Sequence, residues 1–221
     1  MIEYSYDWPG WSLSKNKFGK EFDIEARKRM VDGRLKLNPF IKKYYKKLGT
    51  AILEIGPFFD PLIIPSKFKS KEIFYIDSDH YVKEYLTERF SNITFLLHNL
   101  NTEDENEWFS IEVCIMKELR KKNLKKFDAI VLSQVINYID YKKVFSLIKK
   151  YHTNNGLIFI NNVIDYGIPS LFSDKRPRSD NELIEYLEKI GYKLIEKEII
   201  ATWNKDIQKN NRLILVIQQI K

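Results

Sequence analysis

From residue 51 onward, short apolar runs alternate with stretches in which apolar residues recur every three or four positions. The short runs are typical of strands that are buried on both faces of a parallel sheet, and the longer stretches are typical of helices. The connections between them are short, which is the arrangement of repeated β-α-β units. The five predicted parallel strands are residues 51–55, 72–76, 93–97, 127–133 and 157–161.

Four stretches are predicted to be helices, and the first is predicted from apolar residues at spacings of three and four. The second begins with acidic residues and ends with basic ones, which complements the helix dipole. The third is predicted to stop at Asn154-Asn155-Gly156, which suits a left-handed cap, and Ser179 or Asp180 is placed to cap the fourth. The four predicted helices are residues 81–90, 103–122, 141–152 and 181–190.

The pattern changes in the last thirty residues. Residues 192–200 and 212–220 both read as strands, and the polar loop 202–211 between them shows no helical period. Two strands that are joined without a helical crossover pair antiparallel. The chain therefore predicts an α/β fold in which five parallel strands are followed by an antiparallel hairpin.

Length and composition set the class of protein. A chain of 221 residues with 44% hydrophobic and 30% charged residues suits a soluble globular protein, either one domain with a full core or one domain with an appended arm. No apolar run approaches the roughly 18 residues that a membrane-spanning helix needs, so no membrane contact is expected. A single cysteine, Cys114, forms no internal disulfide and is compatible with a cytoplasmic location. The three histidines show no metal-ligand spacing, and no metal is predicted.

Most of the net charge of +7 belongs to the first fifty residues, which hold 12 Lys and Arg against 6 Asp and Glu. We therefore divide the chain into a helical N-terminal arm or lid, residues 1–48, and an α/β domain, residues 49–221. The arm carries five aromatic residues, Tyr4, Tyr6, Trp8, Trp11 and Phe18. They either pack on the domain or form a lid over the strand ends. The basicity reflects either a compositional bias or contact with an anionic partner.

Two acidic residues mark the ends of the first two strands. Residues 51–56 end in Glu54-Ile55-Gly56, and Asp77 ends the second apolar run roughly twenty residues later. In a parallel sheet a glycine turn lets the backbone approach a ligand, and a carboxylate at the next strand tip accepts hydrogen bonds from a ribose diol. The order predicts a nucleotide-type pocket.

Five motifs follow one another at these predicted strand ends. They are Leu53–Pro57, Tyr75–Asp77, His98–Asn101, Phe127–Ile139 and Asn155–Ile160. In this order and spacing the chain resembles the class I S-adenosylmethionine-dependent methyltransferases over residues 50–221. The resemblance implies a Rossmann-like methyltransferase sheet, S-adenosyl-L-methionine as the cofactor and methyl transfer as the activity.

The resemblance also implies roles for individual residues. Glu54 is expected to organise the methionine end of the cofactor, Gly56 to let the backbone pass close to it, and Asp77 to accept both ribose hydroxyls. The other implied cofactor-binding residues are Pro57, Ser78, Asn99 beside the adenine, Leu100 against its ring and Ser133 near the cofactor and substrate.

The chain departs from the family pattern after the first strand. Gly56 is followed by Pro57-Phe58-Phe59-Asp60-Pro61, without the two further glycines of the familiar loop. Pro61 and Pro65 disfavour a regular helix, so a rigid loop or a single turn is expected. Asn99 stands where many members have Asp, although its amide oxygen can still accept a hydrogen bond.

The methyl acceptor is expected to be a small molecule that receives the methyl group on oxygen or nitrogen. His98, Gln134 and Tyr138, with Asn137, are the polar candidates near the transfer point, and none has a visible catalytic partner. Lys175, Arg176 and Arg178 follow the fifth strand, and their charges make an acidic acceptor one interpretation. Asp128, at a strand entrance, is expected to be structural, and Cys114 to belong to the core.

Two alternatives stay open. An RNA methyltransferase would use the basic arm to follow phosphates, although no target-base motif follows the fourth strand. A non-catalytic binding module would explain the altered glycine loop. The oligomeric state is not indicated by the sequence.

Overall fold

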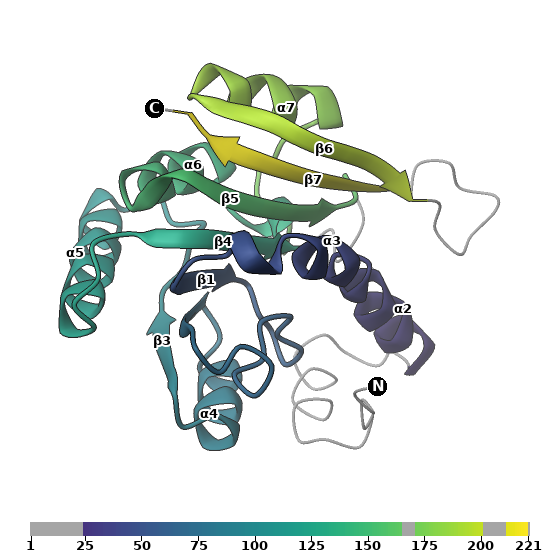
Figure 1. The fold of residues 1–221 in the computed structure, drawn as a ribbon. Helices are drawn as coiled ribbons and strands as arrows, with labels where there is room; N and C mark the ends of the chain where they lie inside the picture. Colours follow the sequence, from purple (N-terminus) through teal and green to yellow (C-terminus); the bar gives the residue numbers. More distant parts are fainter. Residues whose placement is uncertain (1–23, 165–170, 201–210, 221) are drawn as a thin grey trace.

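The computed structural model of the chain describes residues 24–164, 171–200 and 211–220, and side chains from Met30 onward. Its centre is a seven-stranded sheet in the order β3-β2-β1-β4-β5-β7-β6 (Figure 1). The strands are β1 (Ala51–Ile55), β2 (Glu72–Asp77), β3 (Ile93–Leu97), β4 (Phe127–Ser133), β5 (His152–Asn162), β6 (Tyr192–Ile200) and β7 (Arg212–Gln219). The helices are α2 (Ile24–Leu35), α3 (Asn38–Lys43), α4 (His80–Arg89), α5 (Glu105–Lys121), α6 (Tyr141–Lys150) and α7 (Asp180–Lys189), with short 3₁₀ turns η1 (Tyr45–Lys47) and η2 (Ile136–Tyr138).

The pairing confirms the predicted fold class. β1 pairs in parallel with β2 and β4, and β3 and β5 extend the parallel set on either side. β7 pairs antiparallel with both β5 and β6, so it is the strand that runs against the others. The sheet is thus a parallel sheet closed by a C-terminal antiparallel hairpin.

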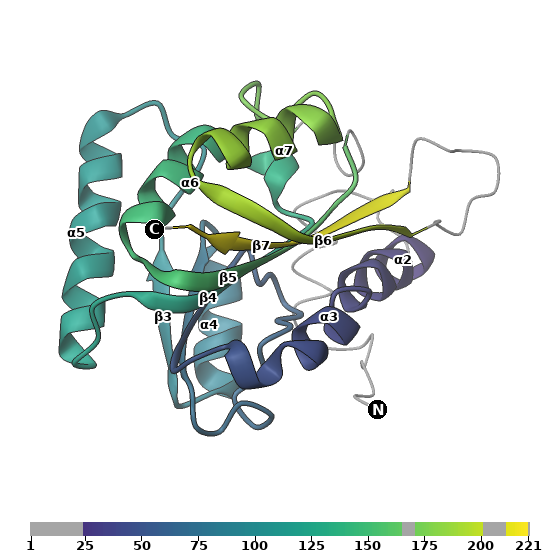
Figure 2. The ribbon, with the colours of Figure 1, turned by 45° about the horizontal axis from the view of Figure 1, so that its top comes forward.

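Alternate residues of each strand enter separate cores on the two faces of the sheet. In β1, Leu53 and Ile55 face the core formed with α5, α6 and α7, whereas Ile52 faces the core formed with α3 and α4. Figure 2 shows these helices on opposite sides of the sheet. Burial on both faces explains why the central strands read as continuous apolar runs.

The described part of the N-terminal arm packs directly on the sheet. Leu37, Phe40, Ile41 and Leu48 are buried in the same core as β1 residue Ile52. The division between residues 48 and 49 stays a prediction. The aromatic residues between Tyr4 and Phe18 lie outside the described residues, as does loop 202–211 except for Asn211.

The predicted end of the third helix is wrong. α6 ends at Lys150, and β5 begins at His152 because the chain there pairs with Phe127 at the start of β4. The backbone N–H of Phe127 donates to the Tyr151 carbonyl at 2.7 Å. The left-handed residue is Asn155, with φ of 65°, and it lies within an irregular part of β5 rather than at a helix cap.

Two other local predictions are confirmed. Ser179 caps α7 by accepting from the N–H of Glu182. Asp128 is structural, since its carboxylate accepts from the N–H groups of Thr50 at 2.6 Å and Ala51 at 3.1 Å at the amino end of β1. None of the helices in the described residues is long and apolar enough to cross a membrane.

His152 predicts a pH dependence of stability. Burial lowers the pKa of its imidazole from 6.5 to about 4. Because the pKa of His152 is lower in the folded than in the unfolded chain, protonation favours unfolding. The folded state therefore keeps its full stability above pH 6.5 and loses part of it as the pH falls toward 4. The shift corresponds to roughly 3 kcal/mol. Urea denaturation between pH 7 and pH 4 should show a smaller loss of unfolding free energy in His152→Phe than in the parent chain. An identical pH profile would contradict this assignment.

Candidate functional site

The carboxyl ends of β1, β2 and β4 meet at one edge of the sheet. The chain proceeds from β1 outward to β2 and β3 and then returns to β4 on the other side of β1. This reversal of strand order between β1 and β4 is a topological switch point, and open α/β sheets bind ligands in the crevice at such a point. All the predicted cofactor-binding residues lie in the loops or strand ends at this edge.

The loop after β1 contains two left-handed residues close together. Gly56 has φ of 64° and Phe58 has φ of 51°. The N–H of Gly56 donates to the Ile76 carbonyl at 2.9 Å, which ties the loop to the end of β2. No helix follows β1 before β2, as Pro61 and Pro65 predicted. A bulky residue such as Phe58 rarely adopts positive φ, and strained backbone of this kind is concentrated at functional sites.

Gly56 is also required by packing within the protein. A Cβ atom at this position would lie 2.5 Å from Cγ2 of Val135, which follows β4. The loops after β1 and β4 therefore approach each other closely at Gly56. Close backbone approach to a cofactor at the same residue stays a prediction.

Asp77 joins the loops after β1 and β2. Its Oδ2 accepts from the Phe58 N–H at 3.3 Å, and its Oδ1 accepts from the Asp79 N–H at 3.1 Å. Burial raises the pKa of the Asp77 carboxyl, and the N–H groups of Asp79, Phe58 and Ser78 oppose this shift. Gly56 and Asp77, about twenty residues apart in the sequence, thus lie in one local structure. Their contact with a single nucleoside stays a prediction.

Glu54 is fully buried and its carboxylate is surrounded by donors. It accepts from the N–H of Leu62 at 2.9 and 3.0 Å, from the N–H of Ile63 at 2.9 Å, and from Arg34 Nη2 at 2.9 Å. Burial raises the pKa of this carboxyl, while Arg34 and the two amide groups oppose the shift. Glu54 therefore fixes both the proline-containing loop and α2 to the end of β1.

Arg34, in α2, is the central donor of this edge. Its Nη1 donates to the carbonyls of Gly56 at 3.1 Å and Ser133 at 2.7 Å, and its Nε donates to the Asp60 carbonyl at 3.2 Å. The residue is only 3% exposed. A single guanidinium thus bridges the carboxyl ends of β1 and β4 at the switch point. The sequence interpretation assigned Arg34 no role.

The end of β4 is held against α2 by amide side chains. Ser133 is fully buried, and its hydroxyl lies 3.3 Å from Asn161 Nδ2, which also donates to the Gly33 carbonyl at 2.7 Å. Gln134 has φ of 59° and donates from Nε2 to the Met30 carbonyl at 2.9 Å. Of the residues expected at the cofactor, Ser133 is therefore covered by the arm.

The remaining candidates are distributed along the same edge. The N–H of His98 donates to the Asp77 carbonyl at 2.9 Å, and burial lowers the pKa of its half-buried imidazole. Asn99 is exposed and its amide oxygen accepts from the Asn101 N–H at 2.9 Å, whereas Leu100 is buried in the core with α5. Pro57 is buried and Ser78 is exposed beside Asp77.

The candidates after β4 separate into two environments. Asn137 is buried and structural, because its Nδ2 donates to the Val163 carbonyl at 2.8 Å. Tyr138 is half-buried, and its ring centroid lies 5.6 Å from that of Phe172. The guanidinium carbon of Arg176 lies 4.8 Å from the Phe172 centroid. Tyr138, Phe172 and Arg176 form one aromatic and cationic wall.

All three cations of the segment after β5 have partners, and Arg176 donates from Nη1 to the Ser173 carbonyl at 3.1 Å. Lys175 Nζ lies 3.2 Å from Glu103 Oε1 and 3.6 Å from Asp140 Oδ2. Arg178 donates from Nη2 to the Asp174 carbonyl at 3.0 Å.

Within the described residues, no group of three or more His, Cys, Asp or Glu side chains is arranged to hold a metal ion. Cys114, in α5, packs against the core, and burial raises the pKa of its thiol.

Comparison with solved structures identifies the fold. Solved structures that superpose on this chain include a Burkholderia thailandensis 1,6-didemethyltoxoflavin-N1-methyltransferase with bound S-adenosylhomocysteine, at TM-score 0.63 and 10% identity, with 95% of this chain and 87% of that chain covered. The CurJ carbon methyltransferase matches at TM-score 0.58 and 12% identity, over 97% of this chain but only 60% of its own length. This chain therefore has the class I S-adenosylmethionine-dependent methyltransferase fold.

One solved structure with the same fold is named for a reaction other than methyl transfer. The [4+2]-cyclase SpnF matches at TM-score 0.60 and 11% identity, with 84% of this chain and 80% of that chain covered. No protein-family profile and no curated protein sequence matches this chain. At these identities the likeness establishes the fold, and activity has to be argued from the site.

The buried ion pair at the strand tips predicts a large effect of Arg34→Met. Removing the guanidinium leaves Glu54 as an uncompensated buried carboxylate, which should lower the unfolding free energy by about 3–5 kcal/mol. Arg34→Met/Glu54→Gln should recover part of that loss, because no buried charge is then left alone. Urea denaturation measures both variants.

The exposed pair Lys43–Glu196, at 2.8 Å, gives a matched control. Lys43→Met should cause no measurable change in unfolding free energy, since exposed ion pairs contribute little. Equal effects of Arg34→Met and Lys43→Met would show that the Arg34 bridge does not stabilise the edge.

Proposed function

We propose that this chain transfers the methyl group of S-adenosylmethionine to an oxygen or nitrogen atom of a small molecule. The observation that carries the proposal is the joining of the left-handed loop at Gly56 and Phe58 to the Asp77 carboxylate, at the switch point of a methyltransferase-type sheet. This arrangement places Gly56, which has no side chain, near the Asp77 carboxylate, which can accept hydrogen bonds from a ribose. The support is the fold together with this local geometry.

The residues fit an adenosine group. A carboxylate accepts both hydroxyls of a ribose, and Asp77 lies beside the half-buried Phe58 and the exposed Ser78. Asn99 is exposed one strand further along the edge, where an amide can meet the edge of a base. The buried Leu100 would contribute to the floor beneath it. These assignments support S-adenosylmethionine as the ligand.

Glu54 is proposed to act through other groups rather than by direct contact. Its carboxylate is already bonded to Arg34, Leu62 and Ile63. A contact with the methionine end would require one of these bonds to break. We therefore assign Glu54 and Arg34 as positioning residues that set the distance between the tips of β1 and β4.

For methyl transfer from S-adenosylmethionine the protein mainly has to align the reactants. S-adenosylmethionine, when bound, supplies an activated methyl group on a sulfonium. The protein aligns the acceptor for in-line attack and excludes water from the site. A hydroxyl acceptor needs a base, and His98 suits this task because burial lowers its pKa and keeps the proton-accepting neutral form at pH 7.

The acceptor is proposed to carry an aromatic and an acidic group. In the Tyr138–Phe172–Arg176 wall, Tyr138 follows β4 and the other two residues follow β5, at the edge where an acceptor would approach the transfer point. Aromatic rings pack on planar acceptors, and an arginine fork suits a carboxylate.

A reducing compartment such as the cytoplasm is proposed from the single free cysteine.

A non-catalytic binding module is the second candidate, and the Arg34 bridge favours it. Arg34 already occupies the backbone acceptors of Gly56 and Ser133 at the switch point. A ligand ammonium group that needed these carbonyls would have to compete with the guanidinium. Binding of the cofactor distinguishes this module from the enzyme.

Calorimetry with S-adenosylmethionine tests the proposed function. Asp77→Ala should weaken cofactor binding by roughly 1–3 kcal/mol, because a charged acceptor for the ribose hydroxyls is lost. Asp104→Ala is the matched control, since Asp104 also accepts a backbone N–H, that of Asn106 at 2.8 Å, but at the start of α5. It should leave the affinity unchanged.

Two results would contradict the proposal. Absence of binding by the parent chain at millimolar cofactor would favour the non-catalytic module. Equal affinity of the Asp77→Ala and parent chains would show that the ribose lies elsewhere.

A further inference from the structure

Two segments without any acidic residue meet at the amino ends of β1 and β2. Residues 33–53 and 61–71 contain no Asp or Glu and carry eight lysines between them. Gly49 precedes β1 and Lys71 precedes β2, and the Lys71 ammonium donates to the Gly49 carbonyl. The fold therefore places together two basic segments that lie apart in the sequence.

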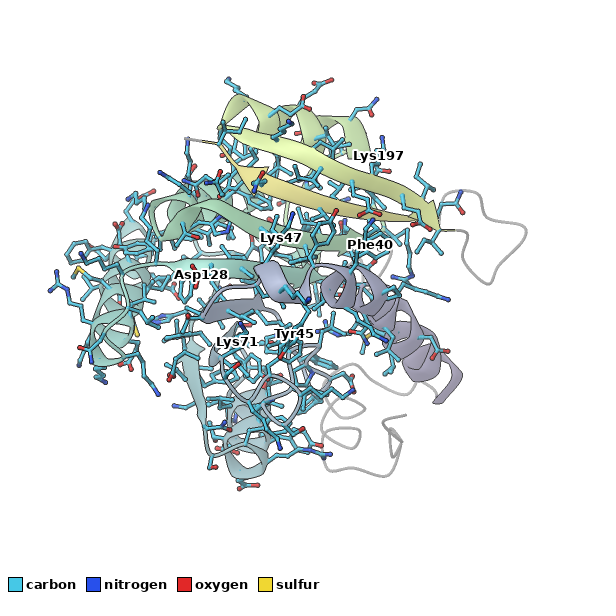
Figure 3. All side chains as sticks on the ribbon, viewed as in Figure 1. Phe40, Tyr45, Lys47, Lys71, Asp128 and Lys197 are labelled. Carbon is cyan, nitrogen blue, oxygen red and sulfur yellow. The ribbon has the colours of Figure 1, made fainter. Side chains whose placement is uncertain are left out.

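An exposed aromatic ring lies at the centre of this surface. The Tyr45 ring centroid is 5.5 Å from that of Phe68, a buried residue, and the Lys71 ammonium lies 5.8 Å from the Tyr45 ring. Tyr45 is nevertheless 39% exposed. Figure 3 shows Tyr45, Lys47 and Lys71 on the same side of the molecule, around the start of β1. Phe68 thus supports a ring that still faces solvent.

The surrounding positive charge is not neutralised within the described residues. Lys46, Lys47, Lys67 and Lys69 are exposed, and no ion pair joins them to a described carboxylate. Two nearby acids, Glu72 and Asp128, form no ion pair with these lysines. Glu72 Oε2 lies 3.0 Å from Lys122 Nζ, and Asp128 accepts the N–H groups of Thr50 and Ala51. We name this surface, Tyr45, Lys46, Lys47, Lys67, Lys69 and Lys71, the basic platform.

We propose that the basic platform binds single-stranded nucleic acid. Lysines follow a phosphate backbone, and an exposed ring among them stacks with an unpaired base. An anionic membrane fits less well, because Tyr45 is the only exposed large apolar side chain of the platform and no exposed aliphatic side chain accompanies it among the platform's described residues. The assignment does not depend on methyl transfer.

The platform lies at the opposite end of the strands from the candidate cofactor site. β1 has five residues, so its first and last Cα atoms are roughly 13 Å apart. A nucleic acid on the platform would hold the protein on the polymer without reaching the candidate cofactor site at Asp77. The platform is therefore a docking surface and not an acceptor site.

Fluorescence anisotropy with a 5′-labelled 20-nucleotide oligouridylate tests the proposal. Lys46→Gln/Lys47→Gln/Lys69→Gln should weaken binding at least tenfold at 0.1 M salt and should lower the salt slope by about two, the value for three lost phosphate contacts. The matched control, Lys83→Gln/Lys117→Gln/Lys189→Gln, removes the same charge from exposed lysines of α4, α5 and α7. It should change the affinity less than twofold.

Tyr45→Leu separates stacking from charge. It should weaken oligouridylate binding by about fivefold or more and leave binding of inorganic polyphosphate, which has no bases, unchanged. Equal losses in the two lysine triples would overturn the proposal in favour of net charge alone. It would also be overturned by tighter binding to vesicles with 30% phosphatidylserine than to RNA, or by no RNA binding at 0.1 mM protein.

Discussion

The ion pair between Arg34 and Glu54 is the contact on which the carboxyl edge of the sheet depends. Both side chains are buried, and burial of either charge alone would be strongly unfavourable. The pair therefore requires α2 to stay docked at the ends of β1 and β4. The same guanidinium bonds the carbonyls of Gly56, Asp60 and Ser133, so one arginine sets the spacing of three segments.

This arrangement connects the arm to any ligand at the switch point. The loop held by Glu54 continues from Gly56 and Phe58, which in turn contact the end of β2 and Asp77. Movement of α2 would release Glu54 and with it the loop that is proposed to meet the cofactor. The arm is accordingly a structural part of the edge, whatever its first residues contribute.

The sequence predicted most of the sheet because burial on both faces leaves continuous apolar runs. The bounds of β1, β3 and β4 were predicted to the residue, and the prolines after Gly56 correctly indicated a loop without a helix. The start of β5 was missed because His152-Thr153-Asn154-Asn155-Gly156 is polar and resembles a helix end, whereas long-range pairing with Phe127 makes it a strand. Arg34 was missed because its partners are twenty or more residues away, and one arginine in a basic segment has no local signal. The identity of the acceptor is not encoded in any such pattern.

The most direct test of the account is a crystal structure of this chain with S-adenosylhomocysteine. We expect the ribose hydroxyls on the Asp77 carboxylate, the adenosine against the loop at Gly56 and Phe58, and the Arg34–Glu54 pair intact beneath the methionine end. A nucleoside bound away from Asp77, or no bound nucleoside at this edge at saturating ligand, would contradict the central claim that this edge of the sheet is the cofactor site.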